Sequence, residues 1–336
     1  MPWSAAMDRA LYGTEGFFRR PEGPAGHFRT SVHASPLFAA AVLRLLREVD
    51  AALGRPDPVC LVDVGAGRGE LAAGLLRALD EDPGEDRLGQ RLRLVAVELA
   101  PRPKDLPEQI SWLPRPPRRV RGLLLANEWL DNVPCDVVEI GPDAVPRLVE
   151  VAPDGAESPG TVPGDSQQAW LECWWPGWRS GEPGQRAEIG LMRDAAWADA
   201  VGSLAAGVAV AIDYAHAVDN RPPFGTLTGY AEGRQVTPVP DGSTDLTAHV
   251  ALDACAAAAE HLAGWSRQLD QRTALRRLGV DGRRPALATA SADPLGYVRA
   301  LSRAGAAAEL TDPAGLGGFG WLVQGVSVPR LPSMED

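Results

Sequence analysis

The sequence predicts an α/β protein with a mostly parallel central sheet. The first observation is an apolar, β-branched strand at residues 59–64, which runs directly into a glycine-rich turn and a helical pattern at 70–79. The second is that further apolar runs, at 92–98, 122–126 and 208–212, recur between helical or irregular segments. Strands that alternate with helices in this way are typical of a parallel sheet covered by helices on both faces.

The length and the charge of the chain limit its architecture and its partners. The chain has 336 residues, a formal net charge of −11 and a pI near 5.0. Because this length exceeds the usual single domain, we expect one α/β core with sizeable insertions. The charge argues against a nucleic acid or an anionic membrane as the main partner. It is compatible with a basic substrate, such as an arginine side chain, and equally with a charge that only keeps the protein soluble.

The cysteines and histidines indicate a reducing compartment and no metal site. Four cysteines are scattered along the chain without a C-x-x-C pair: Cys60, Cys135, Cys173 and Cys255. The histidines show no metal-ligand spacing. No apolar run is long enough to span a bilayer, and residues 1–13 show neither a signal-peptide nor a transit pattern. We therefore expect a cytoplasmic bacterial protein that binds no metal.

Residues 1–55 are expected to form an N-terminal cap segment followed by a helix. Glycines and aromatic residues at 11–18 predict an ordered loop. Ser35 and Pro36 then begin a helix that runs to about Leu53, with its apolar residues on one face.

The turn after the first strand is the strongest signal in the predicted core, residues 56–134. Gly65, Gly67 and Gly69 alternate there, and glycine permits positive φ and close approach of a ligand to the backbone. The next helix offers free N–H groups at its positive end. Dinucleotide folds need G-x-G-x-x-G instead, and Asp63 suits a cationic or hydrogen-bond-donating ligand better than a pyrophosphate. The pattern favours a nucleoside ligand other than NAD.

A second acid supports the same site. The strand at 92–98 ends in Glu98, and an acid after the second strand of dinucleotide folds accepts hydrogen bonds from ribose hydroxyls. We expect Glu98 to bind the ribose. The alternative is a glycine-rich turn that binds nothing, but this alternative leaves the two acids unexplained.

Polar residues follow the strand at 122–126. Asn127, Glu128 and Asp131 lie at the expected carboxyl end of a parallel strand, where ligands of such sheets bind. We predict that Glu128 and Asp131, which could share one face of a helical turn, orient the substrate and take up its proton. Asn127 would hydrogen-bond either the bound nucleoside ligand or the substrate. The alternative is that the two acids only cap the turn.

The rest of the chain is expected to hold an insertion and the second half of the core. Short alternating runs and turns at 135–190 predict a β-rich insertion on the substrate side, with four tryptophans as its local core rather than a ligand cage: Trp170, Trp174, Trp175 and Trp178. Within 191–330 we expect a long active-site loop at 215–247. Helices are expected at 188–204, 248–262, 269–278 and 294–304, and a strand at 319–326.

An ordered set of short motifs carries a family resemblance. The set comprises Leu11-Tyr12-Gly13, Gly16-Phe17-Phe18, Phe28-Arg29-Thr30-Ser31, Asp63 to Leu71, Val97-Glu98, Asn127-Glu128 with Asp131 and Pro134, Ile212-Asp213-Tyr214, Gly225-Thr226-Leu227 and Asp245 to Val250. It resembles the MidA-type S-adenosylmethionine (SAM)-dependent methyltransferases, which are related to the mitochondrial complex I assembly methyltransferase. The resemblance extends from about residue 10 to about residue 325.

The resemblance implies a Rossmann-like class I SAM-methyltransferase fold with a family-specific insertion. It implies that the glycine turn and Glu98 bind SAM and that Thr30 and Ser31 close over it. It also implies that the segment 127–134 faces the transferred methyl group. Because the mitochondrial relative N-methylates an arginine of a protein subunit, we expect the same reaction here.

Departures from the family pattern keep other functions open. His27 replaces an aspartate that is common in the family, Val32-His33 replaces Pro-Glu, and Gly233 stands where a histidine is common. A small-molecule acceptor is therefore one alternative, since a fold does not fix a substrate. A non-catalytic assembly factor that keeps SAM as a structural ligand is another, and a homodimer is a further open expectation.

Overall fold

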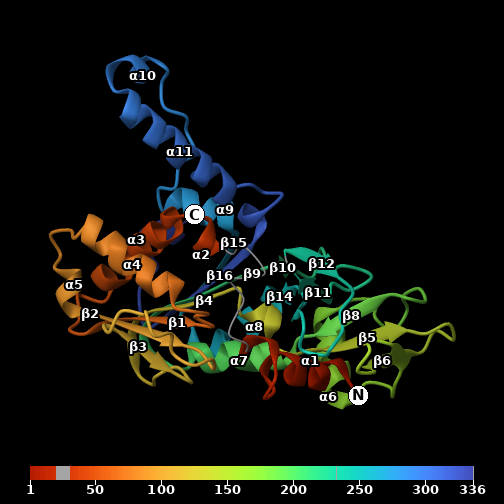
Figure 1. The fold of residues 1–336 in the computed structure, drawn as a ribbon. Coiled ribbons are helices and arrows are strands. Elements are labelled where there is room, and N and C mark those ends of the chain that lie inside the picture. Colours follow the sequence, from red (N-terminus) through yellow and green to blue (C-terminus); the bar gives the residue numbers. More distant parts are fainter. Residues whose placement is uncertain (20–30, 232, 336) are drawn as a thin grey trace.

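A seven-stranded sheet forms the centre of the computed structural model, which describes residues 1–19, 31–231 and 233–335 (Figure 1). Its strand order is β15-β16-β9-β4-β1-β2-β3. The bounds are β1 Val59–Val64, β2 Leu92–Val97, β3 Ile110–Leu113, β4 Val120–Asn127, β9 Leu204–Asp213, β15 Trp265–Asp270 and β16 Gly320–Val326. Neighbouring strands from β3 to β9 are parallel, and β16 runs antiparallel to both of its neighbours. The predicted α/β class with a mostly parallel sheet is confirmed.

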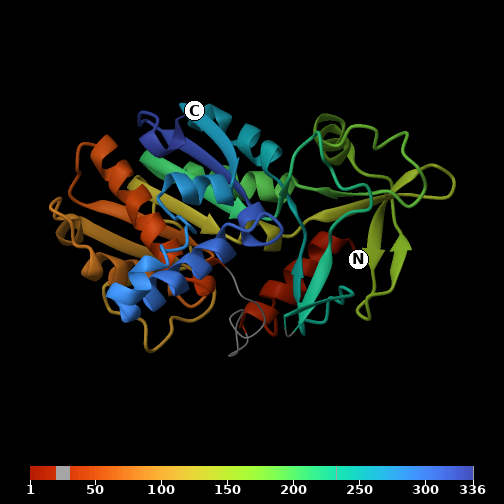
Figure 2. The same cartoon turned by 90° about the horizontal axis from the view of Figure 1, so that it is seen from above.

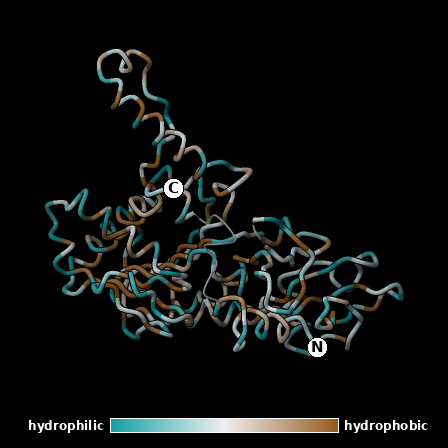
Figure 3. The backbone as a smooth tube through the Cα atoms, viewed as in Figure 1, coloured by the Kyte–Doolittle hydropathy of each residue, from teal (hydrophilic) through white to brown (hydrophobic). Residues whose placement is uncertain are grey.

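Each face of this sheet packs against its own helices. The helices α3 (Pro36–Ala52) and α4 (Glu70–Glu81) cover one face, and α7 (Leu191–Val201) and α8 (Leu252–Ala258) cover the other. Alternate residues of β4 supply the two cores, because successive side chains of a strand point to opposite faces. Leu123 and Leu125 join the α3–α4 core, whereas Leu124 and Ala126 join the α7–α8 core. Figure 3 shows the apolar residues gathered along these strands.

The predicted start of α3 is confirmed. Ser35 is its N-cap, and the side-chain oxygen of Ser35 accepts a hydrogen bond from Leu37 N at 3.1 Å, with Pro36 in the first turn. Before this helix, α1 (Trp3–Tyr12) covers a stretch that the sequence predicted in part as loop. Among the described residues, no helix is both long and apolar enough to cross a bilayer.

The insertion is a second, smaller sheet at one end of the molecule, with α1 beside it (Figures 1 and 2). Its strands are β5 Asp136–Ile140, β6 Pro146–Val151, β7 Glu157–Pro159 and β8 Arg186–Ile189, in the order β7-β6-β5-β8. One unpredicted helix, α6 (Asp165–Trp174), packs on this sheet. Trp170, Trp175 and Trp178 are buried in the core of the insertion and Trp174 packs against it, so the expected local core is confirmed.

The predicted long loop at 215–247 is partly wrong, because it contains a small antiparallel sheet. The strands are β11 Thr228–Ala231, β12 Arg234–Val236 and β13 Asp245–Thr247. Gly233 has φ +73° at the turn between β11 and β12, where a glycine avoids strain. Short polar strands of three or four residues give too little period-2 pattern to be recognised from sequence.

The helices expected at 188–204 and 248–262 are present but shorter than predicted. Within 188–204 the helix is α7, because Glu188 still belongs to β8, where it accepts a hydrogen bond from Leu227 N at 3.0 Å, and β9 begins at Leu204. Within 248–262 the helix is α8, because the short strand β14 (Val250–Ala251) first pairs with β10 (Ala215–His216). The helices α9 (Gln271–Arg277) and α11 (Pro294–Leu310) confirm the other two predictions, and β15 was missed.

Candidate functional site

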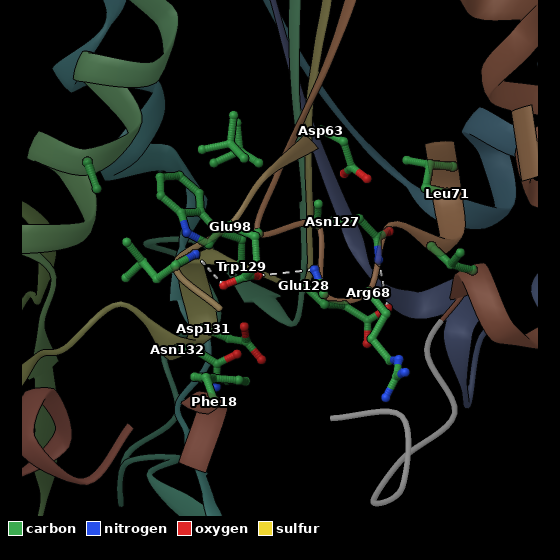
Figure 4. A pocket seen from close by; sticks show the side chains of 18 of the residues that line it. Phe18, Asp63, Arg68, Leu71, Glu98, Asn127, Glu128, Trp129, Asp131 and Asn132 are labelled. Atoms are coloured by element: carbon green, nitrogen blue, oxygen red, sulfur yellow. Dashed lines mark hydrogen bonds between the residues drawn. The ribbon is translucent and has the colours of Figure 1, made fainter. Parts of the chain in front are cut away.

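A cavity of about 410 Å³ lies at the carboxyl ends of β1, β2 and β4. The turn after β1, the acid after β2 and the polar segment after β4 all line it (Figure 4). Parallel strands bring these three sequence-distant segments to one edge of the sheet, which is where open α/β sheets bind their ligands. The structure therefore brings together most of the predicted site residues.

All three glycines of the turn have left-handed backbone angles. Their φ values are +71° at Gly65, +58° at Gly67 and +83° at Gly69. A Cβ atom at Gly65 would lie 2.7 Å from the Trp129 ring, and one at Gly69 would lie 2.6 Å from Leu106 Cδ1. A Cβ atom at Gly67 would meet only Glu70 Oε2, at 3.3 Å, because Gly67 faces the cavity. Gly69 is the N-cap of α4 and does not line the cavity.

Glu98 fastens this turn to the end of β2. Its Oε2 accepts from Gly67 N at 3.1 Å, while Oε1 accepts from Leu99 N at 2.6 Å and Ala100 N at 3.1 Å. A carboxylate has about four lone-pair positions, so Oε2 can still accept a hydrogen bond from a ligand hydroxyl. Burial is the largest influence on Glu98 and raises its pKa, against these three backbone bonds.

Asp63 lies on the cavity wall, and its carboxyl group is disfavoured in the charged form. Burial, reinforced by Glu70 and Glu98, raises the pKa of Asp63 to about 8. Within the described ranges nothing donates a hydrogen bond to this carboxyl group, although the residue is only 3% exposed. A buried carboxyl group without a partner is costly, and a cationic or hydrogen-bond-donating ligand would remove that cost.

Glu128 connects the segment after β4 to the N-terminal segment that contains Ser31. Its Oε1 accepts from Ser31 N at 3.1 Å and from Asn127 Nδ2 at 3.0 Å. Burial raises the pKa of Glu128 to about 7, and the nearby Asp131 acts in the same direction. The residue has φ +52°, a conformation that side chains other than glycine rarely adopt and that is enriched at functional sites.

Asp131 and Asn127 carry acceptor atoms that no described group satisfies. Asp131 lies in the short turn η3 (Leu130–Asn132), and its Oδ2 accepts from Thr247 Oγ1 at 2.7 Å. Asp131 Oδ1 and Asn127 Oδ1 are buried, and neither has a hydrogen-bond partner among the residues that the structure describes. Both residues line the cavity. Buried polar atoms are normally paired, so this pair of oxygens indicates a ligand that donates hydrogen bonds.

The two remaining predicted site residues are Thr30 and Ser31, from the N-terminal segment. Ser31 is buried and does not line the cavity itself, but its backbone N–H reaches Glu128 and its hydroxyl accepts from Gln271 Nε2 at 3.1 Å. Thr30 and the substituted His27 lie outside the described residues. His33 Nε2 lies 3.3 Å from Glu70 Oε1, and this contact raises the pKa of His33.

Four functional positions were not predicted from the sequence. Asp213 Oδ2 accepts from the N–H groups of Leu130, at 2.9 Å, and Asp131, at 3.2 Å, and so fixes the η3 turn. Asp245 and Thr247 approach the same turn from β13. Asp213, Asp245 and Thr247 belong to motifs that carried the resemblance, so the signal was present without an assigned role.

Arg193 is the fourth missed position, and nothing in its sequence context marks it. It is 2% exposed in α7 and donates to three backbone carbonyl groups: Val133 O at 3.0 Å, His249 O at 2.8 Å and Asp131 O at 2.8 Å. These bonds join the segment after β4 to the segment after β13. Arg193 therefore fixes the wall of the site through the backbone.

The sheet and the site together define a class of protein. The chain has the fold and the site of a class I SAM-dependent methyltransferase. The features that define this class are a seven-stranded sheet with one reversed strand, a side-chain-free turn after β1, a carboxylate after β2 and a polar segment after β4. The chain belongs to the Methyltransf_28 family of S-adenosyl-L-methionine-dependent methyltransferases, the MidA or COG1565 family, whose model matches residues 39–269. No curated protein matches the chain at a significant level.

Solved structures support the same fold. A COG1565 superfamily protein from Burkholderia thailandensis, solved with S-adenosyl-homocysteine bound, has a TM-score of 0.78 and 24% sequence identity. The match covers 99% of this chain and 90% of that chain. A native structure of a COG1565 superfamily protein from the same organism gives the same TM-score and identity over 99% of this chain and 89% of that chain. These similarities establish the fold.

Proposed function

We propose that this enzyme transfers the methyl group of SAM to a guanidinium nitrogen of an arginine residue in a protein. The observation that carries the proposal is the pair of buried, unpartnered oxygens, Asp131 Oδ1 and Asn127 Oδ1, next to the Glu128 carboxyl group. A guanidinium group has five N–H donors in one plane, more than an amine or a hydroxyl acceptor can offer. The side chains of Asn127, Glu128 and Asp131 line one cavity, and their oxygens could each accept from one of these N–H groups.

The residues on the cofactor side fit SAM. Gly67 leaves open space in front of the backbone. Glu98 keeps acceptor capacity for ribose hydroxyls, and the unpartnered carboxyl group of Asp63 suits the positive charges of the cofactor. When bound, SAM supplies a methyl group on a positively charged sulfur. In the in-line displacement the sulfur is the leaving group and keeps the electron pair of the broken C–S bond.

The chain's own residues would prepare the acceptor for this displacement. Asp131 and Asn127 would orient the guanidinium group and draw its charge away from one nitrogen, which makes that nitrogen a better nucleophile. The methylated nitrogen must lose a proton. Glu128 suits this role because burial holds its pKa at about 7, where a carboxylate accepts and releases protons near neutral pH.

A small-molecule acceptor is the second candidate. It is favoured by position 33, where the family commonly has a glutamate and this chain has His33. The His33 side chain lines the cavity and contacts Glu70. In either case we place the reaction in the bacterial cytoplasm, and the four free cysteines support this placement.

The test is methyl transfer from tritiated SAM into a cell lysate, followed by mass spectrometry of the labelled product. The proposal expects label on arginine in protein, with label lost for the double variant Glu128→Gln/Asp131→Asn while that variant still binds S-adenosyl-homocysteine. Label on a small molecule alone would select the second candidate. Full rescue of a deletion strain by the inactive double variant would indicate a non-catalytic assembly factor.

A further inference from the structure

Asp245 reaches the cavity from outside the methyltransferase sheet. It begins β13, is 4% exposed and lines the cavity. Asp245 Oδ1 accepts from Asn132 Nδ2 at 2.8 Å, and two residues later Thr247 Oγ1 donates to Asp131 Oδ2 at 2.7 Å. The small β11–β13 sheet is thus joined by side chains to the turn that carries Asp131.

This junction brings together four acids that form no ion pair within the described part of the chain. Glu128, Asp131 and Asp245 line the cavity, and Asp213 lies directly behind them. No described lysine, arginine or histidine forms an ion pair with any of the four acids. The charge of Arg193 acts on Asp131 and Asp213 and opposes the rise of their pKa values, but its hydrogen bonds go to backbone carbonyl groups. Burial and mutual repulsion raise the pKa values of Asp213 and Asp245 well above the ordinary range.

The unpartnered Asp131 Oδ1 is a separate observation that points to a ligand here. The Asp131 side chain is 6% exposed and lies on the cavity wall, yet this oxygen accepts no hydrogen bond among the described residues. Asp131 Oδ2 is already bonded to Thr247. Leaving a buried carboxylate oxygen unpaired is unfavourable, and a donor on a bound ligand would offset this cost.

Aromatic rings complete this part of the cavity. Tyr12, Phe18, Tyr214 and Tyr230 line it, and Tyr12 Oη donates to Asn132 O at 3.2 Å. Cations bind over aromatic faces, and planar guanidinium groups also stack on them. A neutral amide of the same shape lacks the charge that both the rings and the acids attract.

We infer that Asp245, together with Tyr12 and Tyr230, forms a subsite that binds the cationic group of the methyl acceptor. This inference rests on the proposed function, because it names the part of the site that selects a guanidinium-bearing acceptor. Asp245 binds the charged group and, through Asn132, keeps it beside Asp131. The subsite therefore takes arginine side chains and rejects their neutral counterpart, citrulline.

The test measures binding of two matched probes to the full-length protein with saturating S-adenosyl-homocysteine. The probes are Nα-acetyl-L-arginine methylamide and the uncharged Nα-acetyl-L-citrulline methylamide, and the method is calorimetry. Wild type should bind the arginine probe at least about tenfold more tightly than the citrulline probe, since a charge-assisted contact is lost. Asp245→Asn should remove that preference. Asp219→Asn, an exposed acid of the same segment, should keep it.

The outcomes separate this inference from the proposed function. Equal binding of both probes by wild type, or an unchanged preference in Asp245→Asn, would overturn the subsite, even if lysate arginine is still labelled. Absence of S-adenosyl-homocysteine binding by wild type would overturn the proposed function instead. Affinity for S-adenosyl-homocysteine within about twofold of wild type shows that Asp245→Asn is folded. If that variant does not fold, Tyr230→Ala must weaken the arginine probe severalfold, and unchanged binding would contradict the inference.

Discussion

The backbone N–H of Gly67 donates a hydrogen bond to Glu98 Oε2 at 3.1 Å, which joins the turn after β1 to the acid after β2. The two residues are separated by 31 positions in sequence, and the parallel pairing of β1 with β2 brings them together. The glycine supplies open space and the glutamate supplies an acceptor. A nucleoside ligand that bound here would contact both, so each residue gives a separate test.

Replacing Gly67 with valine should abolish SAM binding without unfolding the protein. A Cβ atom at Gly67 would meet only Glu70 Oε2, at 3.3 Å, so the valine side chain would extend into the cavity, and the positive φ would add backbone strain that the control below shares. Calorimetry with S-adenosyl-homocysteine should show at least about a hundredfold loss of affinity. Gly177→Val is the matched control, because Gly177 also has positive φ (+83°) but faces open space. Its binding should equal that of wild type.

Glu98→Gln should weaken both the cofactor and the fold. One amide NH₂ group would replace an oxygen that now accepts from backbone N–H groups, which costs about 1–3 kcal/mol for each donor left unpaired. Thermal unfolding should show a lower midpoint, and affinity for S-adenosyl-homocysteine should fall at least about tenfold. Glu108→Gln, an exposed glutamate nearby, should change neither. Wild-type affinity in Glu98→Gln would exclude a role in ribose binding.

Asp63 should make the ligand-free protein less stable as pH rises. Its pKa is raised to about 8 in the fold, above the ordinary value of the unfolded chain. The folded state therefore holds a proton that the unfolded state releases. The stability associated with this proton is complete below about pH 4 and is lost as pH rises toward 8.

Asp63→Asn should remove this part of the pH dependence. We compare the unfolding midpoint of the variant minus that of wild type. This difference should be larger at pH 8 than at pH 5. The exposed Asp80→Asn on α4 serves as the control and should follow wild type at both values. An identical pH dependence in wild type and Asp63→Asn would show that Asp63 is not held protonated.

The elements recognised from sequence are those with long patterns or strong caps. The strands β1, β2 and β4 are mostly apolar runs of six to eight residues, and Ser35-Pro36 is a strong helix start, so the core and its cofactor edge could be predicted. The short strand β13 could not, because three residues show no periodicity. Strand β15 alternates between half-buried and exposed residues, and it was missed beside the helix that follows it.

The acceptor side of the site was harder to predict than the cofactor side. Asp213, Asp245 and Arg193 act through hydrogen bonds to segments 56 or more residues away in sequence. Such contacts depend on how the insertion and the β11–β13 sheet pack against the core. The local sequence does not specify this packing. Asn127, Glu128 and Asp131 were identifiable because they follow a buried strand directly.

Methyl transfer should increase with pH around the pKa of Glu128. Burial raises this pKa to about 7, so the carboxyl group is protonated below that value and cannot accept the proton of the methylated nitrogen. The rate with saturating SAM should rise between about pH 6 and 8 and then level off. Glu128→Gln should be slow at every pH. A wild-type rate that does not change across this range would contradict the role of Glu128 as proton acceptor.

The decisive measurement of the cofactor site is a crystal structure with S-adenosyl-homocysteine bound. We expect ribose hydroxyls within hydrogen-bonding distance of the Glu98 carboxylate, with the ligand passing in front of Gly67 and close to Asp63. The sulfur should face the wall formed by Asn127, Glu128 and Asp131. A ligand bound elsewhere, or a ribose remote from Glu98, would contradict the account.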